Sequence, residues 1–150
     1  MIRLIDLLKE AKQVGVLYHF TDFNLLKNIL TQNIMIGSFG NQDVKGRYIS
    51  TTRDKNFYKS EPNLGAEELQ AALIFDGDKI SNKYKIRPYA YEPYRYFDRS
   101  GAEAEELILL PGRDFKDVKS YLLGVLLLEP NKSIESLLQK KKIKVITPNN

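Results

Sequence analysis

Few side chains in this chain are suited to catalysis, and its one histidine is the first of them. His19 lies in the run Val16-Leu17-Tyr18-His19-Phe20, whose β-branched and aromatic residues predict a strand. A neutral imidazole offers one donor and one acceptor, so it can bind a ribose hydroxyl. The plainer alternative is a partly buried histidine whose hydrogen bonds are made by the backbone. With one histidine and no cysteine, His-rich metal sites, thiolate metal sites and cysteine nucleophiles are excluded.

A second group of polar side chains follows one predicted strand, Tyr48-Ile49-Ser50-Thr51-Thr52-Arg53. Strand alternation places Tyr48, Ser50 and Thr52 on one face, and Thr51 and Arg53 on the other. Such a row of hydroxyls can line a cleft, with the Arg53 guanidinium at its mouth for a pyrophosphate. The alternative is a half-exposed strand, in which serine and threonine are routine.

Acidic residues precede a third apolar strand. Glu103, Glu105 and Glu106 come directly before Leu107-Ile108-Leu109-Leu110. A glutamate held against apolar walls can accept a hydrogen bond from a sugar hydroxyl and stabilise an oxocarbenium-like transition state. Acidic residues at a strand entrance are as often simply solvated.

A fourth segment, residues 84–96, combines five tyrosines with Arg87, Arg95 and two prolines. The prolines exclude a central strand, so we expect an edge strand or a packed loop. Aromatic residues interleaved with arginines can also stack nucleic-acid bases. Tyrosines that pack a loop onto a sheet are the commoner case.

Several familiar sites are missing from the sequence. It contains no Gly-x-Ser-x-Gly elbow, no Walker lysine spacing and no Gly-x-Gly-x-x-Gly after a strand. The net charge of +4 permits a polyanionic partner without requiring one. Absence of cysteine fits a reducing compartment, and no stretch reaches the roughly 20 apolar residues that span a bilayer. We therefore expect a soluble, cytoplasmic protein.

Apolar periodicity and breaker residues predict the elements that must position these side chains. We expect helices over 2–13, 23–30 and 133–140 and a helical turn over 66–70; strands over 16–20, 34–36, 48–52, 71–75, 106–110, 122–128 and 143–146; loops over 37–46 and 53–65; and a turn at Asp76-Gly77. Helices gather at the ends and strands in the middle. This order predicts a single α+β domain with small mixed or antiparallel sheets and flanking helices.

Three of these segments, in this order, resemble the ADP-ribosyltransferase superfamily. The first is Leu17-Tyr18-His19-Phe20-Thr21 with the helix that follows it, and the second is Ile49-Ser50-Thr51-Thr52. The third runs from Glu103 to the Leu110-Pro111-Gly112 turn and resembles the Glu-x-Glu strand of the family. The chain is also similar to short phage-encoded proteins that share the segments LYHFT, ISTTRD and DGDKIS.

The resemblance implies a site for NAD, used as a substrate, with no metal. NAD would lie in a cleft between the His19 strand and the Ser50 strand, with the nicotinamide inward. His19 would contact the nicotinamide-side ribose, and either Tyr48 or Phe57 would stack on the nicotinamide ring. The further cofactor-binding residues implied are Tyr18, Thr21, Ser50, Thr52 and Arg53.

The catalytic residue implied is one of two glutamates. The distance from the glutamates to Pro111 is one residue longer than in the family pattern, and this slip decides which side chain faces the cleft. Glu106 is the preferred candidate and Glu105 the second. The implied function is mono-ADP-ribosylation of a protein or nucleic acid. The alternatives are a catalytically silent domain of the same fold that binds such a partner, and an RNA-binding protein that uses Arg87, Arg95 and the tyrosines.

Overall fold

The structure is a computed structural model that describes residues 14–39, 46–60, 63–64, 67–88 and 105–148. The predicted helix over 2–13, residues 89–104 with Glu103, and residues 40–45 lie outside the described part of the chain. The elements in chain order are β1 (Val16–Thr21), α2 (Phe23–Gln32), β2 (Ile34–Ile36), β3 (Ser38–Phe39), β4 (Arg47–Thr52), α3 (Phe57–Ser60), β5 (Asn63–Leu64), β6 (Glu67–Glu68), β7 (Ala71–Asp76), α4 (Gly77–Ser81), β8 (Lys85–Pro88), β9 (Glu105–Leu110), β10 (Asp114–Lys116), the 3₁₀ helix η2 (Val118–Tyr121), β11 (Leu122–Leu127), α6 (Lys132–Lys140) and β12 (Val145–Ile146).

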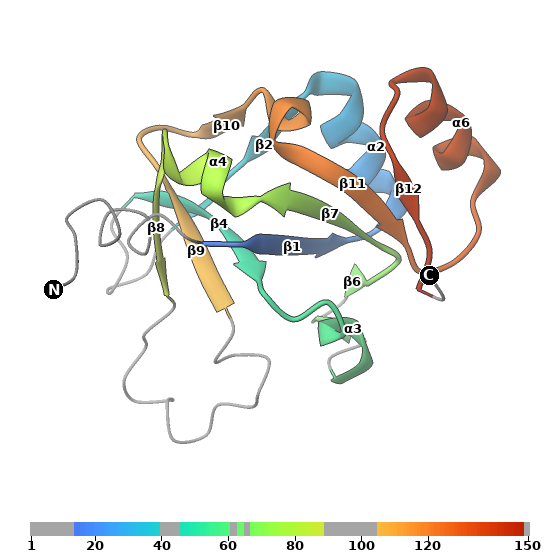
Figure 1. The fold of residues 1–150 in the computed structure, drawn as a ribbon, viewed down its shortest axis with the longest axis horizontal. Helices are drawn as coiled ribbons and strands as arrows, with labels where there is room; N and C mark the ends of the chain where they lie inside the picture. The colour runs from blue at the N-terminus through green and yellow to red at the C-terminus, as the bar shows by residue number, and fades with distance from the viewer. Residues whose placement is uncertain (1–13, 40–45, 61–62, 65–66, 89–104, 149–150) are drawn as a thin grey trace, which may run out of the picture.

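One twisted sheet forms the centre of the molecule, with the strand order β12-β11-β7-β1-β4-β9-β8 and β3 paired to β4 (Figure 1). Neighbouring strands are antiparallel except β11 and β12, which are parallel. Together with the helices this gives an α+β fold, as the sequence predicts. The three strands that carry the candidate chemistry, β1, β4 and β9, are direct neighbours in this order.

The helix after β1 begins and ends where its sequence directs. The Asp22 carboxylate caps α2 by accepting a hydrogen bond from the Leu25 N–H, at 2.7 Å. Asn33 ends the helix in the left-handed conformation, φ 58°, which asparagine tolerates better than most residues. Leu26 and Leu30 are buried, so α2 is held against the sheet by its apolar face.

Apolar side chains fill both faces of the sheet. On one face Leu17 and Leu73 share a core with α2, with α6 through Ile134 and Leu138, and with further buried residues that include Phe115. On the other face a smaller core joins Phe20, Ala72, Ile74 and Leu126, and Phe57 and Tyr58 of α3 pack against it. The sheet is therefore buried from both sides near its centre, where β1 and β7 lie.

Three local predictions between residues 37 and 70 are wrong. The predicted 53–65 loop contains α3 and β5, and the predicted loop over 37–46 contains β3. The predicted helical turn over 66–70 contains β6 instead, because Glu67 and Glu68 pair with Leu64 and Asn63. Tertiary pairing overrides a weak local helix preference here.

The turn predicted at Asp76-Gly77 is the start of a helix. The Asp76 carboxylate accepts from the Lys79 N–H at 3.2 Å and so caps α4. Gly77 donates its N–H to the Gly15 carbonyl at 2.8 Å, and a Cβ at Gly77 would lie 2.4 Å from that oxygen. The glycine is therefore needed for close approach of two backbones and not for a hairpin.

The edge-strand prediction for the proline-containing segment is confirmed where it is described. β8 pairs with β9 alone and ends at Pro88. Among the described residues, no helix is both long enough and apolar enough to cross a membrane.

Candidate functional site

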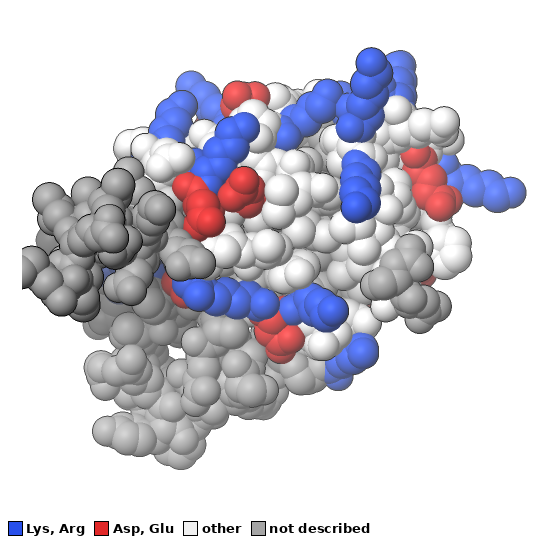
Figure 2. All heavy atoms as spheres, in the orientation of Figure 1, with Lys and Arg blue, Asp and Glu red and all other residues white. Residues whose placement is uncertain are grey.

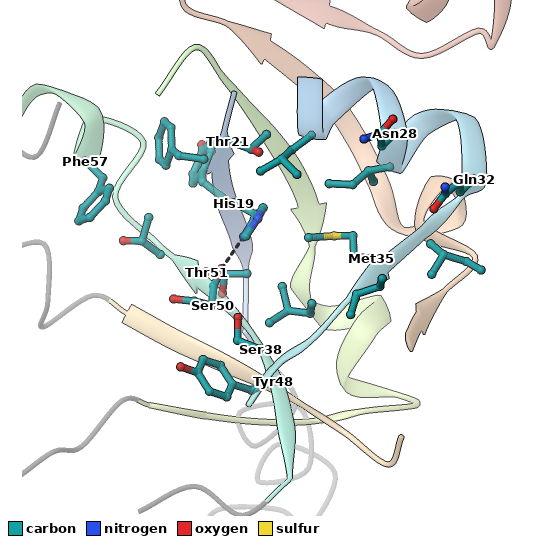
Figure 3. Close-up of a pocket in the computed structure, with 18 residues that line it drawn as sticks. His19, Thr21, Asn28, Gln32, Met35, Ser38, Tyr48, Ser50, Thr51 and Phe57 are labelled. Carbon is teal, nitrogen blue, oxygen red and sulfur yellow. Dashed lines mark hydrogen bonds between the residues drawn. The ribbon is translucent and has the colours of Figure 1, made fainter. Parts of the chain in front are cut away.

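The central feature of the site is a separation between two neighbouring strands. β1 pairs with β7 along its whole length, from Val16 to Thr21, but its ladder with β4 contains the single pair Tyr18–Thr52. The opposite end of β4 pairs with β3, where Ser38 lies across from Tyr48. The middle of β4 therefore faces a gap in the sheet, and α2 and β2 lie beside this gap (Figure 3).

A cavity of about 620 Å³ occupies this gap. This volume is within the range of roughly 300–1,000 Å³ that is usual for small-molecule sites. Its wall combines apolar side chains, mainly from α2 and β2, with polar side chains from β1, β3, β4 and α2. The lining residues are Tyr18, His19, Phe20, Thr21, Leu25, Asn28, Ile29, Gln32, Ile34, Met35, Ile36, Ser38, Tyr48, Ile49, Ser50, Thr51, Thr52 and Phe57.

His19 crosses the gap between the two strands. Its Nδ1 lies 2.7 Å from the Ser50 carbonyl oxygen, and Figure 3 shows the ring extending from β1 toward β4. A carbonyl oxygen only accepts, so Nδ1 carries a proton, and in the neutral form of the ring Nε2 is then an acceptor nitrogen. The side chain thus takes the place of a strand-to-strand backbone bond where the strands have separated. His19 meets both interpretations from the sequence, because it bonds to backbone and also lines the cavity.

We predict that His19→Ala and His19→Asn separate these two roles. An asparagine N–H can replace Nδ1–H toward the Ser50 carbonyl, whereas neither variant provides an acceptor like Nε2. We expect His19→Ala to cost about 1 kcal/mol of unfolding free energy and His19→Asn to cost less. If the cavity is the NAD site that the sequence resemblance implies, both variants should also weaken NAD binding about 10-fold. Urea unfolding and calorimetric titration with NAD measure the two effects. Unchanged NAD affinity in both variants would leave His19 as a structural residue.

The hydroxyl residues of β4 all reach the cavity, although they lie on opposite faces of the strand. Tyr48, Ser50 and Thr52 alternate with Ile49 and Thr51, and all five line the cavity because it opens at the strand edge. The threonine hydroxyls also have local partners. Thr51 Oγ1 donates to the Glu106 carbonyl at 2.9 Å, and Thr52 Oγ1 accepts from the Asp54 N–H at 3.1 Å.

Glu106 lies immediately behind this wall. It is directly opposite Thr51 in the β4–β9 ladder, is 8% exposed, and pairs with Arg53, Nε to Oε1 at 3.0 Å. It does not line the cavity itself, whereas its neighbour Thr51 does. Glu106 is therefore a nearly buried carboxylate one strand away from the gap, about 5 Å in strand spacing.

The register separates the two candidate glutamates. Glu105 pairs with Thr52, and only its backbone is described. Glu106 pairs with Thr51, and residues directly opposite each other in a ladder have their side chains on the same face of the sheet. Glu106 thus shares the face of β4 that carries Thr51.

Of the remaining residues predicted from the sequence, four line the cavity and one does not. Tyr18, Thr21, Tyr48 and Phe57 line the cavity. The Phe57 ring lies 5.9 Å from the Phe20 ring, so it also belongs to the smaller core. Arg53 does not line the cavity.

Sequence reasoning missed the wall contributed by α2. Asn28 and Gln32 line the cavity and lie on the same side of α2 in Figure 3. Their spacing of four residues places two amides on one helix face, next to apolar Leu25 and Ile29. Polar amides beside an apolar stripe, in the helix directly after the His19 strand, were the signal that could have found them.

In the part of the chain that is described, no cluster of three or more His, Cys, Asp or Glu side chains could hold a metal ion. Compared with known proteins, the chain matches no protein family, no curated protein and no solved structure.

Proposed function

We propose that this protein is an ADP-ribosyltransferase-like enzyme that binds NAD in the cavity between β1 and β4. The observation that carries this proposal is the adjacency of three short motifs that are far apart in sequence. β1 with His19, β4 with Ser50 and β9 with Glu106 are consecutive in one sheet, and the cavity opens between the first two. The resemblance in the sequence predicts this same order of motifs around NAD.

The arrangement supports a transfer reaction at the nicotinamide-side ribose. His19 Nε2 accepts a hydrogen bond from a ribose hydroxyl. Glu106 does not itself line the cavity, so in this proposal its carboxylate reaches past Thr51 to accept a hydrogen bond from the 2′-hydroxyl and to stabilise the positive charge that develops on the ring. The bond between ribose C1′ and the nicotinamide nitrogen breaks, and nicotinamide leaves with the electron pair. A nucleophile of the acceptor bonds to C1′ and loses its proton.

The two rings that the sequence offers for nicotinamide lie in different surroundings. Phe57 packs against Phe20 in the smaller core, whereas Tyr48 belongs to the β3-paired end of β4 and lies across from Ser38. Both line the cavity, so both remain candidates for stacking. We then expect the adenine end of NAD to lie against α2, where Asn28 and Gln32 line the cavity.

Asn28 and Gln32 suit recognition of adenine, because an amide can donate to and accept from the edge of that base. We predict that Asn28→Ala and Gln32→Ala each weaken NAD binding about 10-fold, which corresponds to roughly 1.4 kcal/mol. Binding of nicotinamide mononucleotide, which lacks adenine, should change little. Gln139→Ala on α6 is the matched control. Equal losses for both ligands would contradict an adenine site at this wall.

The acceptor is a protein or a nucleic acid. Figure 2 shows Lys and Arg spread over this face with Asp and Glu among them, and not gathered in one patch. The face seen in Figure 2 therefore does not by itself favour a polyanionic acceptor.

The test is transfer of label from NAD that is radiolabelled in its adenylate phosphate. The protein is incubated with cell lysate, and label on macromolecules and free nicotinamide are measured for wild type, Glu105→Gln and Glu106→Gln. Wild type should release nicotinamide and transfer label, and Glu106→Gln should do neither. Nuclease and protease treatment then identify the acceptor class. No transfer of label and no release of nicotinamide from any of the three forms would exclude an ADP-ribosyltransferase activity.

One observation favours a second candidate, a silent domain that binds NAD or another ligand in the same cavity. Glu106 pairs with Arg53 and does not line the cavity. Binding of NAD with no nicotinamide release would select this candidate. The RNA-binding alternative rests mainly on residues 89–96, which lie outside the described part of the structure.

A further inference from the structure

Two residues at the end of β4 hold Glu106 by different parts. Thr51 Oγ1 donates to its backbone carbonyl at 2.9 Å, and Arg53 Nε lies 3.0 Å from its side-chain Oε1. Thr51 and Arg53 are two residues apart, the spacing that places side chains on one face of an extended chain. The main chain and the carboxylate of one residue are thus fixed by the same short segment.

The two partners of the ion pair differ strongly in exposure. The Glu106 side chain is 11% exposed and the Arg53 side chain 49%. A carboxylate that is removed from water is strongly unfavourable unless it is paired, whereas a half-exposed guanidinium is already solvated. The ion pair therefore compensates chiefly for the burial of the Glu106 carboxylate.

The same geometry argues against a separate role for Arg53. The sequence suggests a pyrophosphate ligand at the cleft mouth, but Arg53 is absent from the cavity wall and its Nε already faces Glu106. The hydroxyls and amides that do line the cavity come from other positions.

We infer that Arg53 is a positioning residue that acts through Glu106 and not a ligand of the pyrophosphate. This inference rests on the proposed function. Arg53 holds Oε1, and Oε2 is the oxygen that we assign to the ribose 2′-hydroxyl, which it meets only when NAD is bound because Glu106 does not line the cavity wall. A planar guanidinium fixes the orientation of a carboxylate better than an ammonium group does.

The kinetic test compares wild type, Arg53→Ala and Arg53→Lys in NAD hydrolysis. Arg53→Ala should lower kcat about 10- to 100-fold with KM for NAD changed less than about twofold, because an interaction used only in the transition state is lost. Arg53→Lys should retain part of kcat, and added guanidinium ion should restore part of it in Arg53→Ala. A raised KM with unchanged kcat would assign Arg53 to NAD binding and overturn the inference.

A second test needs no turnover. The melting temperatures of wild type, Arg53→Ala, Glu106→Gln and the double variant form a double-mutant cycle. Loss of Arg53 should lower the melting temperature in wild type and have a clearly smaller effect once Glu106 is replaced. Additive effects would show that the two residues are not coupled and would overturn the inference. A wild-type protein without turnover would remove the proposed function, and this cycle would still decide whether Arg53 acts through Glu106.

Discussion

Glu106→Gln should lower the rate of nicotinamide release from NAD by at least about 100-fold and leave the fold intact. The substitution keeps the size of the side chain and an oxygen that can accept from Arg53, but it removes the negative charge. Removing one group that stabilises developing charge typically costs 10²–10³ in rate. Release is measured by chromatography of nicotinamide at saturating NAD, and the melting temperature is recorded for the same samples.

Glu105→Gln is the matched control for this prediction. Glu105 is one position along the same strand and pairs with Thr52. The same chemical change is therefore made at the neighbouring position of the β4–β9 ladder. We expect its effect on the rate to be less than about 10-fold, because a group that does not stabilise the transition state contributes little to the barrier. If Glu105→Gln abolishes release and Glu106→Gln does not, the assignment of the glutamates is reversed.

The largest expected effect on stability is that of Phe115→Ala. Phe115 of β10 is fully buried, and its ring lies between 5.1 and 5.7 Å from those of Phe75, Tyr84 and Tyr121. Removing a buried phenylalanine costs about 3–5 kcal/mol, because apolar contacts are lost and a cavity remains. Urea unfolding followed by circular dichroism should show this loss as a lower midpoint with an unchanged slope.

Phe39→Ala provides the same change at the surface. Phe39 is 74% exposed, and its main contact is the Arg47 guanidinium, 3.8 Å from the ring centre. An exposed cation–π pair contributes about 0.5–1 kcal/mol, so the expected loss is below about 1 kcal/mol. Equal losses at the two positions would mean that the core does not lie where the structure places it.

The sequence predicts most of the sheet because its strands have strong local signals. Val16–Thr21 and Arg47–Thr52 are rich in β-branched and aromatic residues, and Leu122–Leu127 is a continuous apolar run. The helical prediction at residues 66–70 is wrong because β6 is defined by a partner strand and not by its own composition. The start of α4 depends on the approach of Gly15 to Gly77, 62 residues away, which no local pattern reveals.

The sequence points to several residues of the candidate site but not to its geometry or to its α2 wall. His19 and Ser50 were identified from their types and their places in predicted strands. Their hydrogen bond across a gap in the sheet depends on the single Tyr18–Thr52 pair, which is a property of register. The sequence suggests a pyrophosphate ligand in Arg53, and it does not show that Glu106 is the neighbour of this side chain.

The proposal depends on the adjacency of the three motifs in the sheet, and the position of bound NAD tests this adjacency directly. A crystal structure of the Glu106→Gln variant with bound NAD is the most direct measurement. NAD should occupy the cavity between β1 and β4, with its nicotinamide-side ribose within hydrogen-bonding distance of His19 and closest to β9 at residue 106. NAD bound elsewhere, or no bound NAD at millimolar concentration, would contradict the proposed site.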